Sequence, residues 1–558
     1  TNLHSEHRVF KTVTEQTQTN ATAGMRRTFG DWLLEAEVTY SDASQSRPEM
    51  KNVGFRNNNI NQALPGHTID YSEFTPKITY GTSNFAVPST FTLRLYDERD
   101  VEVDEEIQTA KVDLTWDAKK RSAFALKLKA GGKFYSNDRS TEVNVRAYTG
   151  SLNLANFGAT LPGQNNLGYN NGFEIDYDRA IAYIEANRGS LTLNEVVSRS
   201  SSAANTFEVG QDILAGYVMA TAEFNRLHLL GGVRIERKKK KIRALEYRSV
   251  GGGLGTLFPN NADFDYSNTM PNLQMRYELT KNLILRAAVT ASIRRPEYEF
   301  ASPAATLQVN NFSGGGSVPI TDPVNFPNRG LLTVGNPDLQ PYEAMNYDIA
   351  LEYYLKSGGI LSLALFKKNI ENPIYQALDL QYNVIYNGIA FQDLTISSFQ
   401  NGTDGEVDGV ELALQVPFNF LPAPFDGFGV DGNISLVSSS VEVFSRPGVD
   451  LPLFEQPDRV LNVALYYQKS RFEARLAYNY QDSSLRQIGT QPLFDFYRAD
   501  HYQTDAQASF KLTQHFTLYA SVQNITDQPQ DTYQGLPNQM RFRRMYGTSY
   551  RVGARFRF

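Results

Sequence analysis

Apolar and polar residues alternate with a period of two along most of the chain. Between residues 550 and 558, every even position is apolar, and Arg551, Arg555 and Arg557 occupy odd positions. The same alternation recurs in residues 32–40, 110–116, 124–129, 347–353 and 472–480. Successive residues of a β-strand face opposite sides, so each segment is expected to form a strand with one apolar and one polar face. The pattern predicts an all-β protein.

Two all-β architectures produce such alternation. A soluble sandwich buries its apolar faces, whereas a membrane barrel turns them to lipid and lines a lumen with polar residues. The apolar faces here begin and end in aromatic residues, such as Trp32 and Tyr40, as interfacial girdles do. The segments are about ten residues long, which suits a tilted membrane strand, and no helical stretch or linker interrupts them. These features favour a transmembrane antiparallel up-and-down β-barrel.

The connections between the segments alternate in length. Short ones are expected at residues 117–122, 223–226, 279–282, 356–359, 469–471 and 512–515, and long ones at 150–205, 249–263, 296–336, 376–404 and 481–501. Outer-membrane barrels have short periplasmic turns and long extracellular loops. A barrel of about 22 strands, at about 25 residues per strand and connection, accounts for the length of the chain.

Composition agrees with strands of which only one face meets lipid. Of the 558 residues, 41% are hydrophobic, and no apolar run approaches the length of a membrane helix. The 31 Tyr and 34 Phe residues can supply the aromatic girdles. A net charge of -6 argues against nucleic-acid binding. Because the chain has no cysteine, disulfides, thiolate metal sites and cysteine nucleophiles are excluded.

Several motifs resemble those of TonB-dependent outer-membrane receptors. They occur at residues 231–236, 273–280 with 283–296, 335–341 with 346–354, 405–412 and 522–527, and the chain ends in Phe558. Their order along the chain is that of the family, and the strand pattern extends the resemblance back to Trp32. The motifs are most similar to the subclass common in carbohydrate-scavenging proteobacteria.

The resemblance implies import driven by the TonB complex. Members of the family carry an N-terminal plug domain with a TonB box inside the barrel. Residues 1–558 are expected to form the transmembrane β-barrel, and neither plug domain nor TonB box is present in this chain. The chain is therefore interpreted as the barrel portion of a longer receptor whose plug was removed, processed away or supplied separately.

Charged residues are candidates for two kinds of site. The polar faces of the strands are expected to meet water or a plug inside the barrel, through Arg234, Glu236, Arg286, Asp348, Glu352, Arg475, Arg551 and Arg555. A basic run at the outer rim is a candidate for binding lipopolysaccharide phosphates, and consists of Arg237, Lys238, Lys239, Lys240 and Lys241. Only half of that run can point towards lipid. A solvated strand is the alternative.

Two further sets concern ligand binding and assembly. Aromatic and amide side chains in one long loop could stack on and bond to a sugar, namely Tyr169, Asn170, Asn171, Phe173, Asp176 and Tyr177. A loop packed on itself is equally compatible with these residues. The resemblance assigns the terminal strand, with Tyr550, Val552, Phe556 and Phe558, as the signal read by the barrel assembly machinery.

No set of residues indicates catalysis, a cofactor or a metal. The histidines are scattered, and no serine, histidine and acid combination is evident. The expected function is that of an outer-membrane receptor that imports a large or scarce ligand, with an oligosaccharide favoured over an iron siderophore. A passive diffusion channel and a surface adhesin or phage receptor remain alternatives.

Overall fold

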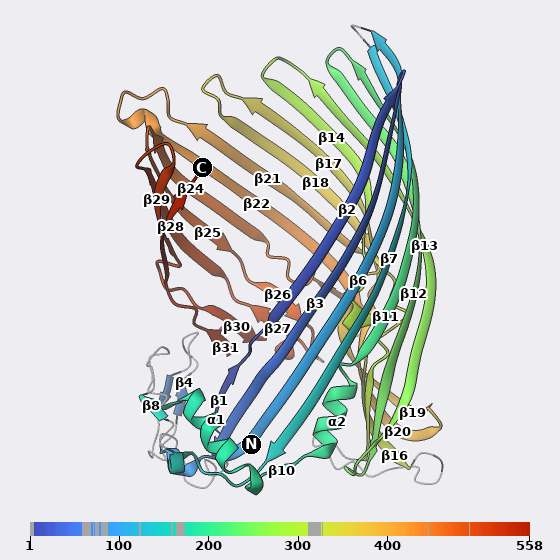
Figure 1. Cartoon of the computed structure of the whole chain (residues 1–558), viewed down its shortest axis with the longest axis vertical. Helices are drawn as coiled ribbons and strands as arrows, with labels where there is room; N and C mark the ends of the chain where they lie inside the picture. The colour runs from blue at the N-terminus through green and yellow to red at the C-terminus, as the bar shows by residue number, and fades with distance from the viewer. Residues whose placement is uncertain are drawn as a thin grey trace.

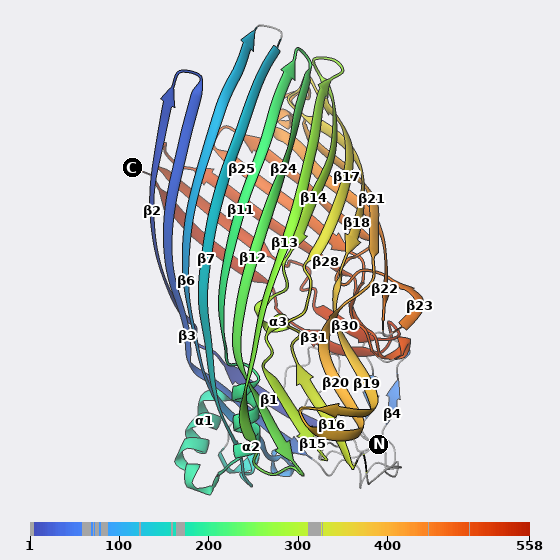
Figure 2. The same ribbon diagram turned by 90° about the vertical axis from the view of Figure 1, so that its right-hand side faces the viewer.

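The structure of the protein is a computed structural model. It describes residues 5–57, 68–70, 72, 77–79, 87–121, 124–157, 160–162, 173–310, 325, 327–444, 446–489 and 491–557. A 24-stranded sheet dominates these residues and curves around a central space (Figures 1 and 2).

Antiparallel neighbours in chain order form the wall of this sheet. From one edge to the other, the wall strands are β2 (Glu15–Phe29), β3 (Trp32–Asn57), β6 (Thr92–Arg121), β7 (Phe124–Thr149), β11 (Phe207–Phe224), β12 (Leu227–Val250), β13 (Thr256–Glu278), β14 (Leu283–Arg294), β17 (Tyr342–Tyr354), β18 (Ile360–Glu371), β21 (Gly405–Pro417), β22 (Phe428–Val443), β24 (Arg459–Lys469), β25 (Phe472–Gln481), β28 (His501–Lys511), β29 (Phe516–Gln523) and β32 (Ser549–Phe556). The up-and-down antiparallel architecture is confirmed. The total of about 22 strands and the closure of the barrel remain predictions.

Apart from one short 3-10 turn between β21 and β22, the other elements gather at the end of the wall that carries the long connections (Figure 1). The strands there are β1 (Ser5–Lys11), β4 (Thr68–Asp70), β5 (Lys77–Thr79), β8 (Thr160–Pro162), β9 (Phe173–Ile175), β10 (Thr192–Leu193), β15 (Ala305–Val309), β16 (Asn328–Val334), β19 (Ile374–Tyr386), β20 (Ile389–Asn401), β23 (Arg446–Leu451), β26 (Ser484–Gln487), β27 (Phe496–Arg498), β30 (Gln530–Gln534) and β31 (Met540–Arg544). The α-helices are α1 (Tyr177–Ala186), α2 (Glu195–Ala203) and α3 (Tyr298–Ala301). Short 3-10 turns are η3 (Pro88–Thr90), η4 (Leu154–Phe157), η5 (Arg188–Ser190), η6 (Phe425–Gly427) and η7 (Pro492–Phe494).

The register places the apolar residues of neighbouring strands side by side. One row across β12, β13, β14, β17 and β18 consists of Leu229, Met275, Ala287, Ile349 and Leu365. These residues belong to the outer, apolar face of the wall. Trp32 and Trp116 stack at 5.5 Å between ring centroids on the same face, which agrees with the aromatic girdle expected from the sequence.

Several strands are much longer than the expected ten residues. β6 has 30 residues, and β12 and β13 continue through most of the predicted loop 249–263. Outside the bilayer the backbone groups still need hydrogen-bond partners, and extending the ladder provides them. The short turns lie where expected, for example between Phe224 and Leu227.

Helices interrupt the predicted loop 150–205, where none was expected. Asp176 and Asn194 cap α1 and α2 by accepting the backbone N–H of Arg179 and Val197, respectively. None of the helices in the described part of the chain is long and apolar enough to span a membrane.

The buried core also lies at the long-loop end, because the wall itself is a single layer. One cluster joins β1, β3, β6 and β9 to α1 through Val9, Phe55, Leu93, Phe173 and Ile184. A second packs α3 on the inner face of β11 and β12, and a third joins β15, β16 and β20. β15 reaches β12, and β16 reaches β20, by parallel pairing, so these strands hold α3 beside the wall.

Candidate functional site

The described part of the predicted ligand loop is packed against the core of the loop end. Phe173 is 3% exposed, stacks on His7 at 4.4 Å and meets Phe91 edge-on at 5.2 Å. Asp176 caps α1, and the Lys11 ammonium lies 5.6 Å from the centre of the Tyr177 ring. Tyr169, Asn170 and Asn171 lie outside the described residues. The described members therefore have structural contacts, and their contact with a ligand remains a prediction.

An ion network fastens α1 and η5 to the wall. The Glu98 carboxylate on β6 accepts hydrogen bonds from Arg188 at 2.7 Å and from Arg146 at 3.2 Å. Glu185 of α1 accepts from Lys51 at 3.0 Å and from Arg188 at 2.9 Å. Charge-assisted bonds of this kind are the strong ones, so this loop is held firmly on the strand ends.

Two titratable groups of this region have shifted pKa values. Burial lowers the pKa of His7, against a smaller raising effect of Glu174, so the buried ring is kept neutral. Burial tends to raise the pKa of Glu185, but hydrogen bonds from Tyr96, Lys51 and Arg188 outweigh it and hold that pKa below its usual range. Both shifts support a structural role for the network.

The inner wall carries most of the predicted luminal charges as ion pairs. Arg234 donates to Glu236 at 2.7 Å, and Arg295 binds the same carboxylate. Arg286 donates to Glu352 at 2.7 Å. Asp348 is exposed, one residue from Tyr347 and Ile349 of the outer face, and therefore faces the opposite side. Most of these charges therefore pair with one another within the wall, and docking of a plug remains a prediction.

A basic pocket lies on the inner face near the short-turn end of β22 to β32. Its lining includes Arg475, Arg551, Arg555, Arg557 and Lys511. Arg475 is paired with Asp431, and Lys511 with Glu473. Among the described residues, no ion pair is found for the three arginines of β32 and its end. This pocket can hold a negatively charged group.

The basic run on β12 is divided between the two faces of the wall. Arg237, Lys239 and Lys241 are exposed on the outer face, and Arg237 pairs with Asp265 at 2.6 Å. Lys238 and Lys240 point inwards and are 3% and 2% exposed. They lie beside Arg295, which follows β14, and Tyr298 of α3, two residues that the sequence did not single out. The outward apolar residues Val233 and Ile235 share the parity of Arg237, so the alternation could have revealed the division.

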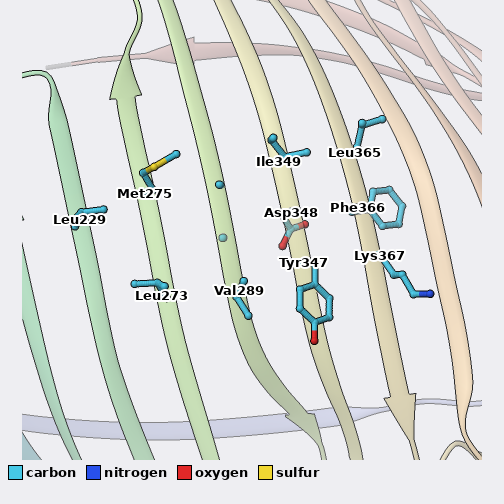
Figure 3. A pocket seen from close by; sticks show the side chains of 12 residues that line it. Leu229, Leu273, Met275, Val289, Tyr347, Asp348, Ile349, Leu365, Phe366 and Lys367 are labelled. Atoms are coloured by element: carbon cyan, nitrogen blue, oxygen red, sulfur yellow. The ribbon is translucent and has the colours of Figure 1, made fainter.

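An apolar depression lies on the outer face of β12, β13, β14, β17 and β18. Figure 3 shows Leu273, Val289, Tyr347 and Leu365 standing on adjacent strands, with Lys367 at its border. It is formed by the rows of residues that face lipid. We therefore interpret it as part of the membrane contact and not as a ligand site.

The motif at residues 335–341 contacts the α3 segment and holds it in place. A Cβ atom at Gly335 would collide with the carbonyl oxygens of Phe300 and Ser302. Asn336 donates its backbone N–H to Phe300 at 2.7 Å and its side-chain amide to the Phe399 carbonyl at 2.9 Å. The motif thus joins α3 to β20 at the inner rim.

The terminal strand β32 displays the predicted assembly residues on its outer face. Tyr550, Val552 and Phe556 are all strongly exposed, and Val552 is 83% exposed. Phe558 lies outside the described residues. Recognition by an assembly machinery remains a prediction.

The described residues contain no group of three or more His, Asp or Glu side chains arranged to hold a metal ion.

Together, the alternating wall, the aromatic girdle and the charged interior define an outer-membrane β-barrel. A family model for "TonB dependent receptor-like, beta-barrel" matches residues 52–525, and the chain belongs to this family. It is accordingly a protein of the bacterial outer membrane. The resemblance noted in the sequence is confirmed, although the carbohydrate subclass is not.

Solved structures of outer-membrane receptors have a fold similar to that of this chain. The ferric-catecholate import receptor Fiu from E. coli K12, in its closed form, is similar with a TM-score of 0.58 and 14% identity, over 98% of this chain and 65% of that chain. BauA, the ferric preacinetobactin receptor of Acinetobacter baumannii, has a TM-score of 0.51 and 12% identity, over 97% and 63%. These similarities establish the fold alone.

A sequence relative is the iron-regulated outer membrane virulence protein of Vibrio cholerae serotype O1 (strain ATCC 39541 / Classical Ogawa 395 / O395). It is 23% identical over 263 residues, which are 47% of this chain and 36% of that protein. The match thus spans little more than a third of the relative.

Proposed function

We propose that this chain is the barrel of a receptor that captures a scarce or bulky ligand and imports it with energy from the TonB complex. The match of the family model over residues 52–525 carries the proposal. The charged inner wall supports it, because such a surface suits a lumen through which a polar ligand passes. The role is transport, not catalysis.

An iron chelate is the favoured ligand class. The sequence alone favoured an oligosaccharide, but neither the family model nor the Vibrio cholerae relative supports that preference. The Vibrio cholerae relative is described as iron-regulated, and this description supports a ligand that carries iron. In this proposal, Tyr177 and the neighbouring residues 169–171 remain candidates for ligand contact at the extracellular end.

Energy coupling requires a plug domain with a TonB box, and the basic luminal pocket is a suitable docking surface for it. Arg551, Arg555 and Arg557 have no acidic partner among the described residues, so an acidic face of a plug would complement them. On the outside, Arg237, Lys239 and Lys241 are the proposed contacts with lipopolysaccharide. The barrel assembly machinery is the proposed reader of β32.

Growth of a deletion strain tests the import function. We expect a defect under iron limitation in the presence of the natural chelator, and the same defect when TonB is absent. Growth on single carbon sources should be unchanged. A defect confined to one sugar would restore the oligosaccharide hypothesis, whereas uptake that persists without TonB would support a passive channel.

A further inference from the structure

The turn between β21 and β22 is apolar, whereas the neighbouring turn between β24 and β25 is charged. Residues 418–427, here called the aromatic turn, read Phe-Asn-Phe-Leu-Pro-Ala-Pro-Phe-Asp-Gly, and residues 469–471 read Lys-Ser-Arg. In the aromatic turn, Phe420 is 69% exposed and Phe425 is 55% exposed. Two large apolar rings that lack cover from the protein indicate a surface that meets another apolar phase.

The aromatic turn is held in one position by its neighbours. Asn419 donates its side-chain amide to the backbone carbonyl of Ser357 at 2.8 Å. On the other side, Asp426 forms an ion pair with Lys469 of β24. A Cβ atom at Gly427 would lie 2.9 Å from that of Lys469, so η6 packs directly against β24. The exposed rings therefore project from a fixed part of the backbone.

The strands that flank the aromatic turn carry aromatic residues on the outer face. The outer row that contains Leu365 continues to Val410 of β21 and Leu436 of β22. Phe428 lies an even number of residues before Leu436 on the same strand, so it faces the same, outer side. Tyr467 of β24 pairs with Phe428, and their rings meet edge-on at 4.8 Å between centroids. These rings belong to the surface that faces lipid.

The exposed rings of the aromatic turn join this surface. Phe425 stacks on Phe428 at 6.4 Å between ring centroids, and the ring of Phe420 lies 5.9 Å from that of Phe418. Phe418 donates its backbone N–H to the Phe428 carbonyl at 2.7 Å, which places the two ends of the turn side by side. The aromatic turn is thus continuous with the lipid-facing side of the wall.

Strand length places the aromatic turn at the surface of the membrane. β24 and β25 have 11 and 10 residues. A tilted strand needs about 9–11 residues to cross the hydrocarbon core, so these two strands have no surplus and their connecting turn lies at the edge of the bilayer. The ion pair between Lys469 and Asp426 holds the aromatic turn at the same level.

We propose that the aromatic turn is an interfacial anchor that inserts Phe420 and Phe425 into the periplasmic, phospholipid leaflet of the outer membrane. Aromatic side chains favour the boundary between headgroups and acyl chains, and an apolar segment in this plane buries its rings by about 5–10 Å. The partner of this surface is a lipid layer. The anchor fixes the depth of β21 to β25 in the bilayer, and it does not depend on the proposed import function.

Depth-dependent fluorescence quenching tests the anchor. Residues 1–558 contain no cysteine, so a single introduced thiol can be labelled with the fluorophore NBD once any cysteine elsewhere in the full-length receptor is changed to serine. Phe420→Cys and Phe425→Cys are compared, as separate variants, in vesicles of phosphatidylethanolamine and phosphatidylglycerol. The matched control is Ser470→Cys, which places the label at an exposed position of the charged turn beside them.

Two quenchers distinguish lipid from water. A phospholipid with a doxyl group near the headgroup end of its acyl chain should quench the labels at 420 and 425 at least about threefold more strongly than the label at 470. Aqueous iodide should show the reverse order. Heat modifiability confirms that each variant has assembled, and Ala423→Cys, a smaller change in the same turn, replaces any variant that has not.

Equal quenching by the doxyl lipid in both turns, or stronger quenching by iodide in the aromatic turn, would overturn the proposal. Protection of the aromatic turn from both quenchers would show that a protein surface covers it, and this outcome also refutes a lipid anchor. Quenching requires neither ligand nor TonB, so its result is independent of the growth experiment.

Discussion

At the scale of single residues, the side of the strand decides the role of a side chain. Lys238 and Lys239 are adjacent in the sequence, yet one is buried against Tyr266 and the other is exposed on the outer face. Alternation of the backbone causes this difference, since successive Cβ atoms point to opposite faces. Two adjacent lysines on one strand therefore lie in different environments, one buried among aromatic rings and the other exposed.

The buried pair of Arg446 and Asp495 should stabilise the loop end. Arg446 donates to Asp495 at 2.8 Å, and both side chains are almost fully buried. Asp495→Ala leaves the guanidinium unpaired, which costs about 3–5 kcal/mol. We expect faster hydrogen exchange of β26 and β27.

The matched control for that variant is Glu455→Ala. Glu455 is half exposed and reaches Arg486 and Arg498 only at 3.5 and 3.4 Å. Its loss should cost about 0–1 kcal/mol. Equal exchange in the two variants would contradict the importance of the buried pair.

His7 should make the loop core sensitive to acid. Burial lowers its pKa below the ordinary 6.5, so the folded state binds protons less readily than the unfolded state. Stability is full above pH 6.5 and declines as the pH falls through 6.5 towards the folded pKa. Hydrogen exchange of α1, corrected for its intrinsic pH dependence, should rise on acidification, and His7→Phe should abolish the rise. An unaltered pH profile in His7→Phe would show that another group is responsible.

At the scale of elements, strand orientation follows from the cross-strand rows. Leu363 on β18 lies between Leu351 of β17 and Leu412 of β21, and these residues form part of the outer face. Its neighbour Ala364 lies between Ala350 and Glu411 on the inner face. The outer face of β18 thus faces lipid, and its inner face lines the lumen.

This orientation can be tested by placing the same charge on either side. Leu363→Arg puts a guanidinium in the apolar face, at a cost of about 2–4 kcal/mol near the bilayer midplane. Ala364→Arg places it opposite Glu411, where it should be tolerated. We expect less heat-modifiable barrel in the outer membrane for the first variant only. The reverse ranking would mean that the assigned faces are inverted.

At the scale of the whole molecule, the wall is a single layer whose interior must be filled or guarded. Among the residues that the structure describes, the buried apolar clusters lie at the extracellular end, where loop strands and helices cover one another. The periplasmic half instead presents the basic pocket of β22 to β32 to the lumen. Docking of a plug domain with an acidic face at this pocket remains a prediction.

Reversal of that charge should open the pore. Arg551→Glu with Arg555→Glu would repel an acidic plug face, so cells should become several-fold more sensitive to vancomycin, which is too large for porins. Lys241→Glu with Arg243→Glu reverses two charges on the outer face and should have no such effect. Unchanged sensitivity at equal receptor levels would argue against docking at these arginines.

The sequence by itself determined the strand pattern, the aromatic girdle, the placement of the short turns and the family. Each depends on periodicity or on local motifs, which are readable along one chain. It overestimated the loop at residues 249–263, because the glycines before Thr256 and the Pro-Asn-Asn stretch at 259–261 are typical of loops, although β13 already begins at Thr256. It also missed α1 and α2, whose short helical segments lie within a long polar connection.

Only the tertiary structure decided which charges meet. Glu236 binds Arg234 from its own strand and Arg295 from the segment before α3, a pairing that depends on strand register and on the seating of α3 by Gly335. The same packing leaves Lys238 and Lys240 without a carboxylate. Distances between residues remote in sequence depend on how the strands pair and on how α3 folds over the wall. The alternation within a single strand predicts neither the pairing of the strands nor the position of α3.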